Sequence, residues 1–281
     1  MMKKFCELIK EEDFWVNLWH EIVGNTIVLK TQWSEPQKWK QFYDAAGSLF
    51  SRLWGDAEKL GREIACFMAS EGIITETDRV LDVGCGTGWL STALASFVLS
   101  VTALDYSSSM VKYSNAVIEN CGISNVHVVH KDFYDFTPDE PFDTVIAAFF
   151  PQAISPSGIF KLEQWARRRC VLVLQYSSSG MLVKQRLFEH LIGQIPPSPG
   201  MTLPLWCFGY LISRGKRPEI RKYHWESKIT MTADDMLEFY KSYFAVFGFD
   251  KETVKDAFYR VGISDENNVL SCDLAILWWE K

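Results

Sequence analysis

The sequence lacks any long uninterrupted apolar segment. No run approaches the roughly 20 apolar residues that a membrane-spanning helix needs. A signal peptide would carry an unbroken apolar stretch near the amino terminus, but charged residues interrupt that region within the first 13 positions: Glu7, Lys10, Glu11, Glu12 and Asp13. We therefore expect a cytoplasmic protein with no membrane partner.

An excess of positive charge is also missing. The 29 lysines and arginines are outnumbered by 35 aspartates and glutamates, which gives a formal net charge of -6. Such a chain has no global positive field that would gather a phosphate backbone, so nucleic acid is not an expected partner. The one dense basic cluster, Arg167 to Arg169 in "ARRRC", is interpreted as the last turn of a helix, where cations offset the helix dipole.

Cysteine pairs at metal-binding spacing are absent as well. The seven cysteines are scattered, with no C-x-x-C pair and no histidine at zinc-ligand spacing. We expect them to serve as small buried apolar side chains. The sequence accordingly predicts no structural metal.

Short apolar runs alternate with segments of helical period from Arg79 to Ser177, which is typical of βαβ units in a parallel sheet. The five expected parallel strands are 79–83, 101–105, 126–130, 142–149 and 170–176. Helices are expected at 88–98, 107–121 and 157–168, led by Gly88, Ser107 and Ser157. Two later strands, 219–229 and 272–280, are expected to pair at the sheet edge. The predicted fold is a doubly wound, mostly parallel seven-stranded α/β sheet with an antiparallel closing strand.

Further helical segments flank this region. They are expected at 5–23, 36–53, 56–70, 181–194, 232–247 and 251–261, with "PPSPG" at 196–200 ending the fourth of them. We predict four parts: N-terminal helical segments that cover the core (1–75), a ligand-binding core (76–180), a helical lid-like insertion (181–218), and a carboxyl-terminal part of the sheet with its helices (219–281).

The stretch "LDVGCGTG" places Gly84, Gly86 and Gly88 where a strand ends and a helix begins. A turn without side chains exposes backbone amides to a ligand. The spacing is G-x-G-x-G, whereas a dinucleotide-binding turn would be G-x-G-x-x-G. Asp82, two residues before the first glycine, favours a positively charged ligand and repels a pyrophosphate.

Two more carboxylates follow the next two strands. Asp105 ends the second strand 21 residues after Gly84, where an acidic side chain reaches the hydroxyls of a ribose. Asp132 follows the third strand in "HKDF", beside Phe133. There the carboxylate is placed to accept a hydrogen bond from an exocyclic amine, and Phe133 to pack against a planar base. The alternative is that all three aspartates only form turns or cap helices.

Through "VLDVGCGTG", "ALDYSSSM" and "HKDF", the chain resembles the class I S-adenosylmethionine-dependent methyltransferases over residues 79–177. The resemblance implies that Asp82 and the glycine turn cradle the methionine moiety, that Asp105 binds the ribose, and that Met110 and Phe133 flank adenine with Asp132 near its amine. The expected cofactor-binding residues are Asp82, Gly84, Cys85, Gly86, Gly88, Asp105, Tyr106, Met110, Asp132, Phe133 and Phe149, although Cys85 is interpreted as packing.

The end of the fourth strand, "AAFFPQ" at 147–152, lacks the N-P-P-[YF] of the family's base- and amide-nitrogen methyltransferases. Ala147 and Ala148 stand where metal-dependent relatives place an aspartate ligand, so no catalytic metal is expected. Phe149, Phe150 and Gln152 are candidates for the junction between methyl donor and acceptor. The alternative for the phenylalanines is ordinary core packing.

No catalytic base stands out. The weak candidates are His20, His190 and His224 in the flanking segments and Tyr176 at the end of the fifth strand. Many of the 11 tryptophans fall outside the core, at positions 15, 19, 33, 39, 54, 206 and 225. They indicate either an aromatic acceptor pocket or rings that attach the added helices to the core.

The sequence as a whole predicts an enzyme that transfers a methyl group from S-adenosylmethionine to a small, apolar or aromatic molecule by in-line displacement. One alternative is a regulatory protein that binds the cofactor without turnover. A second is a nucleotide-dependent oxidoreductase, which the glycine spacing and Asp82 oppose. The sequence leaves open the acceptor, its nucleophilic atom and the oligomeric state.

Overall fold

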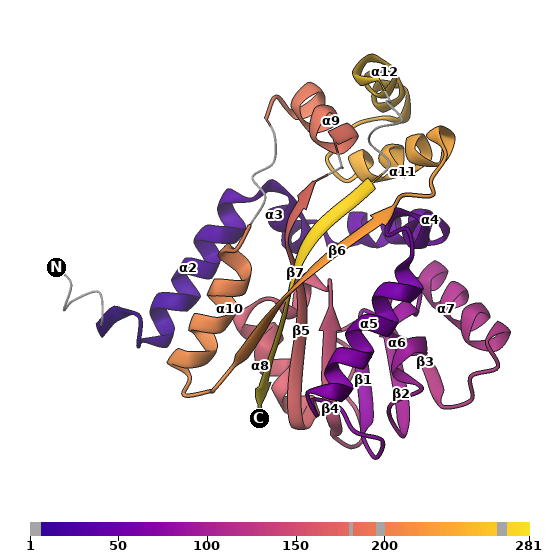
Figure 1. The fold of residues 1–281 in the computed structure, drawn as a ribbon. Helices are drawn as coiled ribbons and strands as arrows, with labels where there is room; N and C mark the ends of the chain where they lie inside the picture. The colour runs from indigo at the N-terminus through magenta and orange to yellow at the C-terminus, as the bar shows by residue number, and fades with distance from the viewer. Residues whose placement is uncertain (1–6, 180–181, 195–199, 263–268) are drawn as a thin grey trace.

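A computed structural model describes residues 7–179, 182–194, 200–262 and 269–281 (Figure 1). The strands are β1 (Arg79–Val83), β2 (Ser100–Asp105), β3 (Val126–His130), β4 (Phe142–Ala148), β5 (Ala166–Ser179), β6 (Glu219–Lys228) and β7 (Val269–Glu280). The helices before β1 are α2 (Glu12–Asn25), α3 (Ile27–Ser34), α4 (Pro36–Leu53) and α5 (Ala57–Ser70). The later ones are α6 (Trp89–Leu94), α7 (Ser108–Asn120), η1 (Pro151–Ala153), α8 (Pro156–Trp165), α9 (Leu182–Ile192), α10 (Thr202–Ser213), α11 (Ala233–Ala245) and α12 (Lys251–Val261).

The seven strands form one sheet in the order β3-β2-β1-β4-β5-β7-β6. β1 to β5 pair in parallel, and β7 lies antiparallel between β5 and β6. The predicted fold class is therefore confirmed, including the pairing of the two late strands. The strand order reverses between β1 and β4, and open α/β sheets bind ligands at the carboxyl ends of the strands beside such a switch point.

Each face of the sheet is covered by its own hydrophobic layer. In β4, Val145 and Ala147 point into the cluster formed with α8, α10 and α2, whereas Ile146 and Ala148 point into the cluster formed with α5 and α6. This alternation follows from the two-residue period of a strand. Because both faces are buried, residues 145–148 of β4 are all apolar.

A third hydrophobic cluster, here called the helical cap, joins α4, α9, α11 and α12. These helices lie together beyond the upper ends of the parallel strands in Figure 1. The cap is dense in aromatic rings, with Phe42 of α4 in edge-on contact with Phe239 and Tyr243 of α11 at centroid distances of 5.4 Å. A layer of helices therefore covers the edge of the sheet where a ligand is expected.

Several helix starts follow from capping chemistry. The Ser107 hydroxyl accepts a hydrogen bond from the Met110 amide at α7, as the sequence predicts, whereas α8 is capped by Ser155 and begins before the predicted Ser157. Thr232 and Asp235 form a reciprocal capping box at α11. α6 begins after Gly88, as predicted, but ends at Leu94, four residues short of the prediction.

The sequence patterns do not predict helices at α3 or α10. In α3 the buried side chains are Leu29 and Gln32, so a polar residue occupies the inward face and the apolar periodicity is lost. α10 is apolar on nearly all sides because it lies between α2 and the sheet, where Gly209 leaves room for the ring of Trp15. Parts of two predicted helices and of the predicted helix stop lie outside the described residues: 5 and 6, 181, and 196–199 of "PPSPG".

The interpretation of Arg167 to Arg169 as a helix end is wrong. α8 ends at Trp165, and the three arginines belong to the first residues of β5, where they pair with carboxylates. Arg167 pairs with Asp143, Arg168 with the buried Asp78, and Arg169 with Glu280 of β7. The run of cations therefore joins β5 to its surroundings through ion pairs.

The expectation for the cysteines is correct in part. Cys85, Cys170, Cys207 and Cys272 are buried and free, whereas Cys66 on α5 and Cys121 in the turn after α7 are exposed. Cys6 lies outside the described residues.

Within the described ranges, no helix has both the length and the apolarity to cross a membrane.

Asp78 offers a test of the buried ion pair. Besides Arg168, its carboxylate accepts hydrogen bonds from the hydroxyls of Thr75 (2.6 Å) and Thr144 (3.1 Å). We expect Asp78→Ala to lower the free energy of unfolding by about 2–4 kcal/mol, because buried Thr144 and half-buried Arg168 lose their partner. Urea denaturation measures the change. Glu140→Ala, which removes an exposed pair with Arg79, should cost less than about 1 kcal/mol, and equal losses in the two variants would contradict the prediction.

Candidate active site

The glycine turn between β1 and α6 has the conformation that its sequence demands. Gly84, Gly86 and Gly88 all have positive φ, at 70°, 53° and 81°. A Cβ on Gly84 would lie 2.4 Å from the ring of Phe150, whereas a Cβ on Gly86 would meet open space. Gly84 is thus required for the approach of Phe150, and Gly86 leaves its backbone accessible from the cavity that it lines.

Asp105 fastens this turn to the end of β2. One carboxylate oxygen accepts a hydrogen bond from the Gly86 amide at 2.9 Å, and the other accepts one from the Ser107 amide at 2.8 Å. The side chain is buried, and burial raises its pKa, although the hydrogen bonds oppose that shift. Each oxygen keeps a second lone pair with which to accept a hydroxyl.

Asp82 lies below the turn, away from the cavities. Its carboxylate is 1% exposed and accepts a hydrogen bond from the Ser91 hydroxyl at 2.6 Å. The pKa of Asp82 is raised to about 7, chiefly by burial; the hydrogen bond from Ser91 lowers it and the nearby Asp105 charge raises it. The contact visible in the structure therefore joins β1 to α6.

Two adjoining cavities meet at the glycine turn. The first, here called the strand-end cavity, has a volume of about 320 Å³ and is lined by Asp132, Phe133 and Tyr134 after β3 and by Trp33 and Pro36. The second, here called the aromatic cavity, has a volume of about 270 Å³ and extends from the turn into the helical cap. Six residues line both: Gln32, Gly84, Asp105, Tyr106, Phe150 and Gln152.

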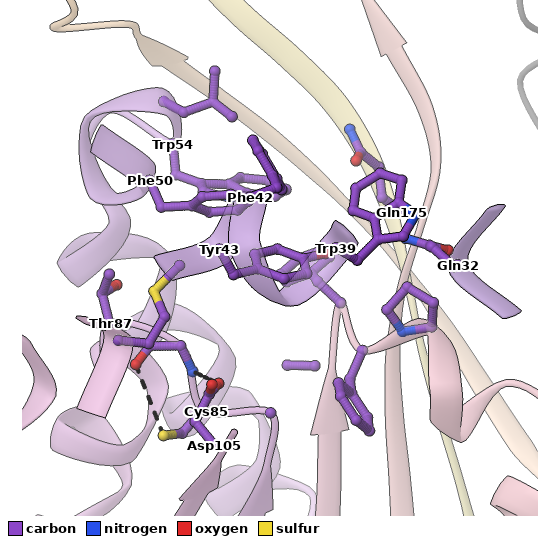
Figure 2. Close-up of a pocket in the computed structure, with 18 of the residues that line it drawn as sticks. Gln32, Trp39, Phe42, Tyr43, Phe50, Trp54, Cys85, Thr87, Asp105 and Gln175 are labelled. Atoms are coloured by element: carbon purple, nitrogen blue, oxygen red, sulfur yellow. Dashed lines mark hydrogen bonds between the residues drawn. The ribbon is translucent and has the colours of Figure 1, made fainter. Parts of the chain in front are cut away.

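The aromatic cavity takes its walls from elements far apart in the sequence. Figure 2 shows Trp39, Phe42, Tyr43 and Phe50 of α4 opposite the glycine turn, where Cys85, Thr87 and Asp105 lie. Phe239 and Tyr243 of α11, Lys184 of α9 and Leu270 of β7 complete it. Burial raises the pKa values of the Tyr43 and Tyr243 hydroxyls well above their usual range, so both stay protonated near neutral pH.

Phe149 marks the place where the two halves of the site join. It is the one described non-glycine residue with positive φ, at 53°, and its ring lies between Trp54 and Trp89 at centroid distances of 4.6 and 5.9 Å. Its amide donates to the Val173 carbonyl. A strained backbone persists only where neighbouring contacts hold it, and such residues gather at functional sites.

The structure brings most of the predicted cofactor-binding residues together. The aromatic cavity is lined by Gly84, Cys85, Gly86, Asp105, Tyr106, Met110 and Phe149, and the strand-end cavity by Gly84, Asp105, Tyr106, Asp132 and Phe133. Asp82 and Gly88 line neither cavity. Asp82 faces Ser91, and Ser114 fills the space beside Gly88. Met110 and Phe133 line different cavities, so their joint contact with adenine stays a prediction, as do the ligand contacts of the whole set.

The four candidate bases lie away from both cavities. His20 packs edge-on against Trp19, and His224 pairs with Asp273 at 2.8 Å across β6 and β7. Tyr176 lies beneath the Lys222 ammonium, and His190 is exposed on α9. None of them is among the described residues that line these two cavities. In the same part, no cluster of three or more His, Cys, Asp or Glu is placed to hold a metal ion.

Some tryptophans line the two cavities and others pack against the sheet, and the use of the aromatic cavity by an acceptor stays a prediction. Trp39 and Trp54 line the aromatic cavity and Trp33 the strand-end cavity, whereas Trp15, Trp19, Trp206 and Trp225 pack in the two sheet layers. Phe149, Phe150 and Gln152 line the aromatic cavity, where the sequence places the donor–acceptor junction. The prediction missed Gln32, Tyr43, Lys184, Phe239 and Tyr243. For Phe239 and Tyr243, the sequence signal is the aromatic-rich stretch "MLEFYKSYF".

Comparison with known proteins identifies the core. A family model described as "Methyltransferase domain" matches residues 80–168. A probable (S)-tetrahydroprotoberberine N-methyltransferase from Papaver bracteatum is 25% identical over 164 residues, 57% of this chain and 42% of that protein. A probable cobalt-precorrin-6B methyltransferase from Thermoplasma acidophilum is 34% identical over 30% of this chain and 44% of its own length.

The fold comparison agrees with this assignment. The crystal structure of magnesium protoporphyrin IX methyltransferase from Synechocystis, with bound S-adenosylhomocysteine, superposes with a TM-score of 0.52 at 15% identity, covering 85% of this chain and 96% of that one. Together with the glycine turn and the strand order, these matches show that residues 80–168 form a methyltransferase domain with the fold of the class I S-adenosylmethionine-dependent enzymes. The chain spans less than half the length of the two curated relatives named above.

The raised pKa of Asp82 predicts a pH-dependent stability. The folded protein binds this proton more tightly than the unfolded chain, so stability is lost as pH rises from about 4, the unfolded pKa, to about 7, the folded pKa. Because asparagine cannot ionise, we expect the free energy of unfolding of Asp82→Asn, relative to that of the wild type, to rise on the order of 2–3 kcal/mol when pH is raised from 5 to 8. Urea denaturation at both pH values tests this.

The matched control for this experiment is Asp139→Asn, which removes an exposed carboxylate on the same domain. Its free energy of unfolding should follow that of the wild type across the same pH interval. If the Asp82→Asn protein also runs parallel to the wild type, the buried carboxyl group titrates in its ordinary range and the prediction is wrong.

Proposed function

We propose that this protein transfers a methyl group from S-adenosylmethionine to a small aromatic molecule held in the aromatic cavity. The observation that carries the proposal is the continuity of the two cavities. The glycine turn and Asp105 line both, so a ligand on the turn faces the strand-end cavity on one side and the aromatic cavity on the other.

The residues at the turn fit the cofactor. Gly86 offers its backbone to open space, and Asp105 retains lone pairs for ribose hydroxyls. Asp132 and Phe133 offer a carboxylate and a ring face for an adenine base in the strand-end cavity. The bound cofactor supplies an electrophilic methyl carbon on a sulfonium, which an acceptor atom displaces in line.

The cavity walls favour a small acceptor over a macromolecule. α3, α4, α9 and α11 all contribute side chains around the aromatic cavity, so an acceptor group must enter between helices. The net charge of -6 gives no general attraction for nucleic acid. The relatives do not decide this point, because they include proteins named as ribosomal RNA and protein lysine methyltransferases as well as small-molecule enzymes.

The protein's own contribution to the reaction is positioning and exclusion of water. The described lining residues of the aromatic cavity include no histidine or glutamate, and each Asp105 oxygen already accepts one amide hydrogen bond. The aromatic walls give a cavity of low polarity, which aligns an acceptor whose nucleophile carries a lone pair without a strong base. The same scarcity of bases is what a cofactor-binding protein without turnover would show, and a transfer assay distinguishes the two.

Cofactor binding tests the first half of the proposal. Isothermal titration with S-adenosylhomocysteine should show saturable binding to the wild type, and Asp105→Asn should weaken it about 10–100-fold, because hydrogen bonds to a charged group contribute roughly 1.5–3 kcal/mol. Asp139→Asn should bind like the wild type, since that carboxylate is exposed and lines neither of these cavities. Unchanged affinity in the Asp105→Asn protein would argue against the ribose contact.

Methyl transfer tests the second half. The protein is incubated with methyl-labelled S-adenosylmethionine and a small-molecule metabolite extract, with separate RNA and protein fractions as comparison arms. Label should pass to a compound in the small-molecule fraction. Transfer confined to RNA or protein would contradict the small acceptor, and saturable cofactor binding without transfer in any fraction would favour the regulatory alternative.

A further inference from the structure

The end of the aromatic cavity formed by the helical cap contains a cation that has no ion-pair partner among the described residues. Lys184 of α9 is the one cationic side chain among the described residues that line this cavity. Its ammonium lies 4.8 Å from the ring centroid of Tyr243, and no carboxylate in the described residues forms an ion pair with it. Burial lowers the pKa of Lys184 to about 8.

Three polar atoms of residues that line the same cavity also lack partners. The hydroxyls of Tyr243 and Tyr106 and Gln32 Oε1 are buried without a hydrogen bond in the described part of the chain, and Tyr243 and Gln32 are only 4% and 8% exposed. A buried polar atom without a partner costs roughly 1–3 kcal/mol. With Lys184, four polar groups that are costly to bury unpaired therefore belong to the walls of a cavity that a ligand is expected to fill.

The chemistry of these groups sets what a ligand must offer. An ammonium and a protonated phenol both donate hydrogen bonds, and a carboxylate accepts from both. Gln32 Oε1 accepts, so it needs an N–H or O–H. Gln32 lines both cavities, whereas Lys184 and Tyr243 line only the aromatic one. The site thus presents an acceptor atom at the junction with the cofactor side and a pair of donors deeper among the cap helices.

The surfaces between these polar groups are flat and apolar. Trp39, Phe42 and Phe239 contribute rings to the cavity wall. Edge and face contacts with such rings favour a planar aromatic body. A small aliphatic acid would satisfy Lys184 but would leave the ring surfaces uncovered.

Resting on the proposed function, we propose that the methyl acceptor is an aromatic carboxylic acid. Its carboxylate pairs with the Lys184 ammonium and accepts from the Tyr243 hydroxyl, and its nucleophilic N–H or O–H group lies toward Gln32 at the cofactor junction. Lys184 and Tyr243 act in this site as residues that determine specificity.

The test compares matched acids and amides. Binding of 3-hydroxy-2-naphthoic acid, 6-hydroxy-2-naphthoic acid and 6-amino-2-naphthoic acid, and of their carboxamides, is measured by titration in the presence of saturating S-adenosylhomocysteine. For at least one pair, the wild type should bind the acid at least 10-fold more tightly than the amide. The ratio should fall to about 1 in Lys184→Met and recover at least in part in Lys184→Arg, which restores the charge.

Lys222→Met is the matched control, because Lys222 also lies over a tyrosine ring, 5.9 Å from that of Tyr176, but outside the cavity. It should keep the wild-type ratio. A naphthyl phosphate arm tests whether another anion is preferred, and tighter binding of phosphate than carboxylate would overturn the assignment of a carboxylic acid.

The failure of this inference differs from failure of the proposed function. If the wild type binds S-adenosylhomocysteine but prefers no acid over its amide, or if the preference survives in Lys184→Met, the inference is wrong and the methyltransferase proposal stands. If the wild type does not bind S-adenosylhomocysteine at all, the proposed function itself is wrong.

Discussion

The hydrogen bonds from the Gly86 and Ser107 amides to the Asp105 carboxylate are the interactions on which the rest of the site depends. The Gly86 bond joins the turn after β1 to the end of β2, beside the switch point between β1 and β4. The Gly84 and Cys85 amides also donate to the Leu104 carbonyl of β2, so the turn is held against that strand. The missing Cβ of Gly84 then leaves room for Phe150.

The helical cap supplies the second constraint. Its rings pack on one another across α4, α9, α11 and α12, and this packing closes the aromatic cavity over the turn. Phe149, held with positive φ between Trp54 and Trp89, lies between the turn and the cap. The cofactor side and the acceptor side therefore share a wall, so a change in cap packing should affect the geometry at the turn.

The two sides of the site differ in how far relatives inform them. The methyltransferase match covers residues 80–168, which contain the glycine turn, Asp105 and Asp132. The groups that would choose an acceptor, Gln32 and Lys184 among them, lie outside that range. Relatives that share the domain can therefore act on very different acceptors, and the acceptor of this chain has to be inferred from its own cavity.

The sequence by itself determined the sheet, the glycine turn and Asp105, because strand alternation, glycine conformation and capping are local properties of neighbouring residues. Only the tertiary structure decided that Arg167 to Arg169 form ion pairs from β5 and that Asp82 faces Ser91 instead of a cavity. It also brought Gln32, Lys184 and Tyr243 to one cavity from three separate helices. Contacts between segments so distant in the chain leave no local pattern, since they depend on how whole layers pack.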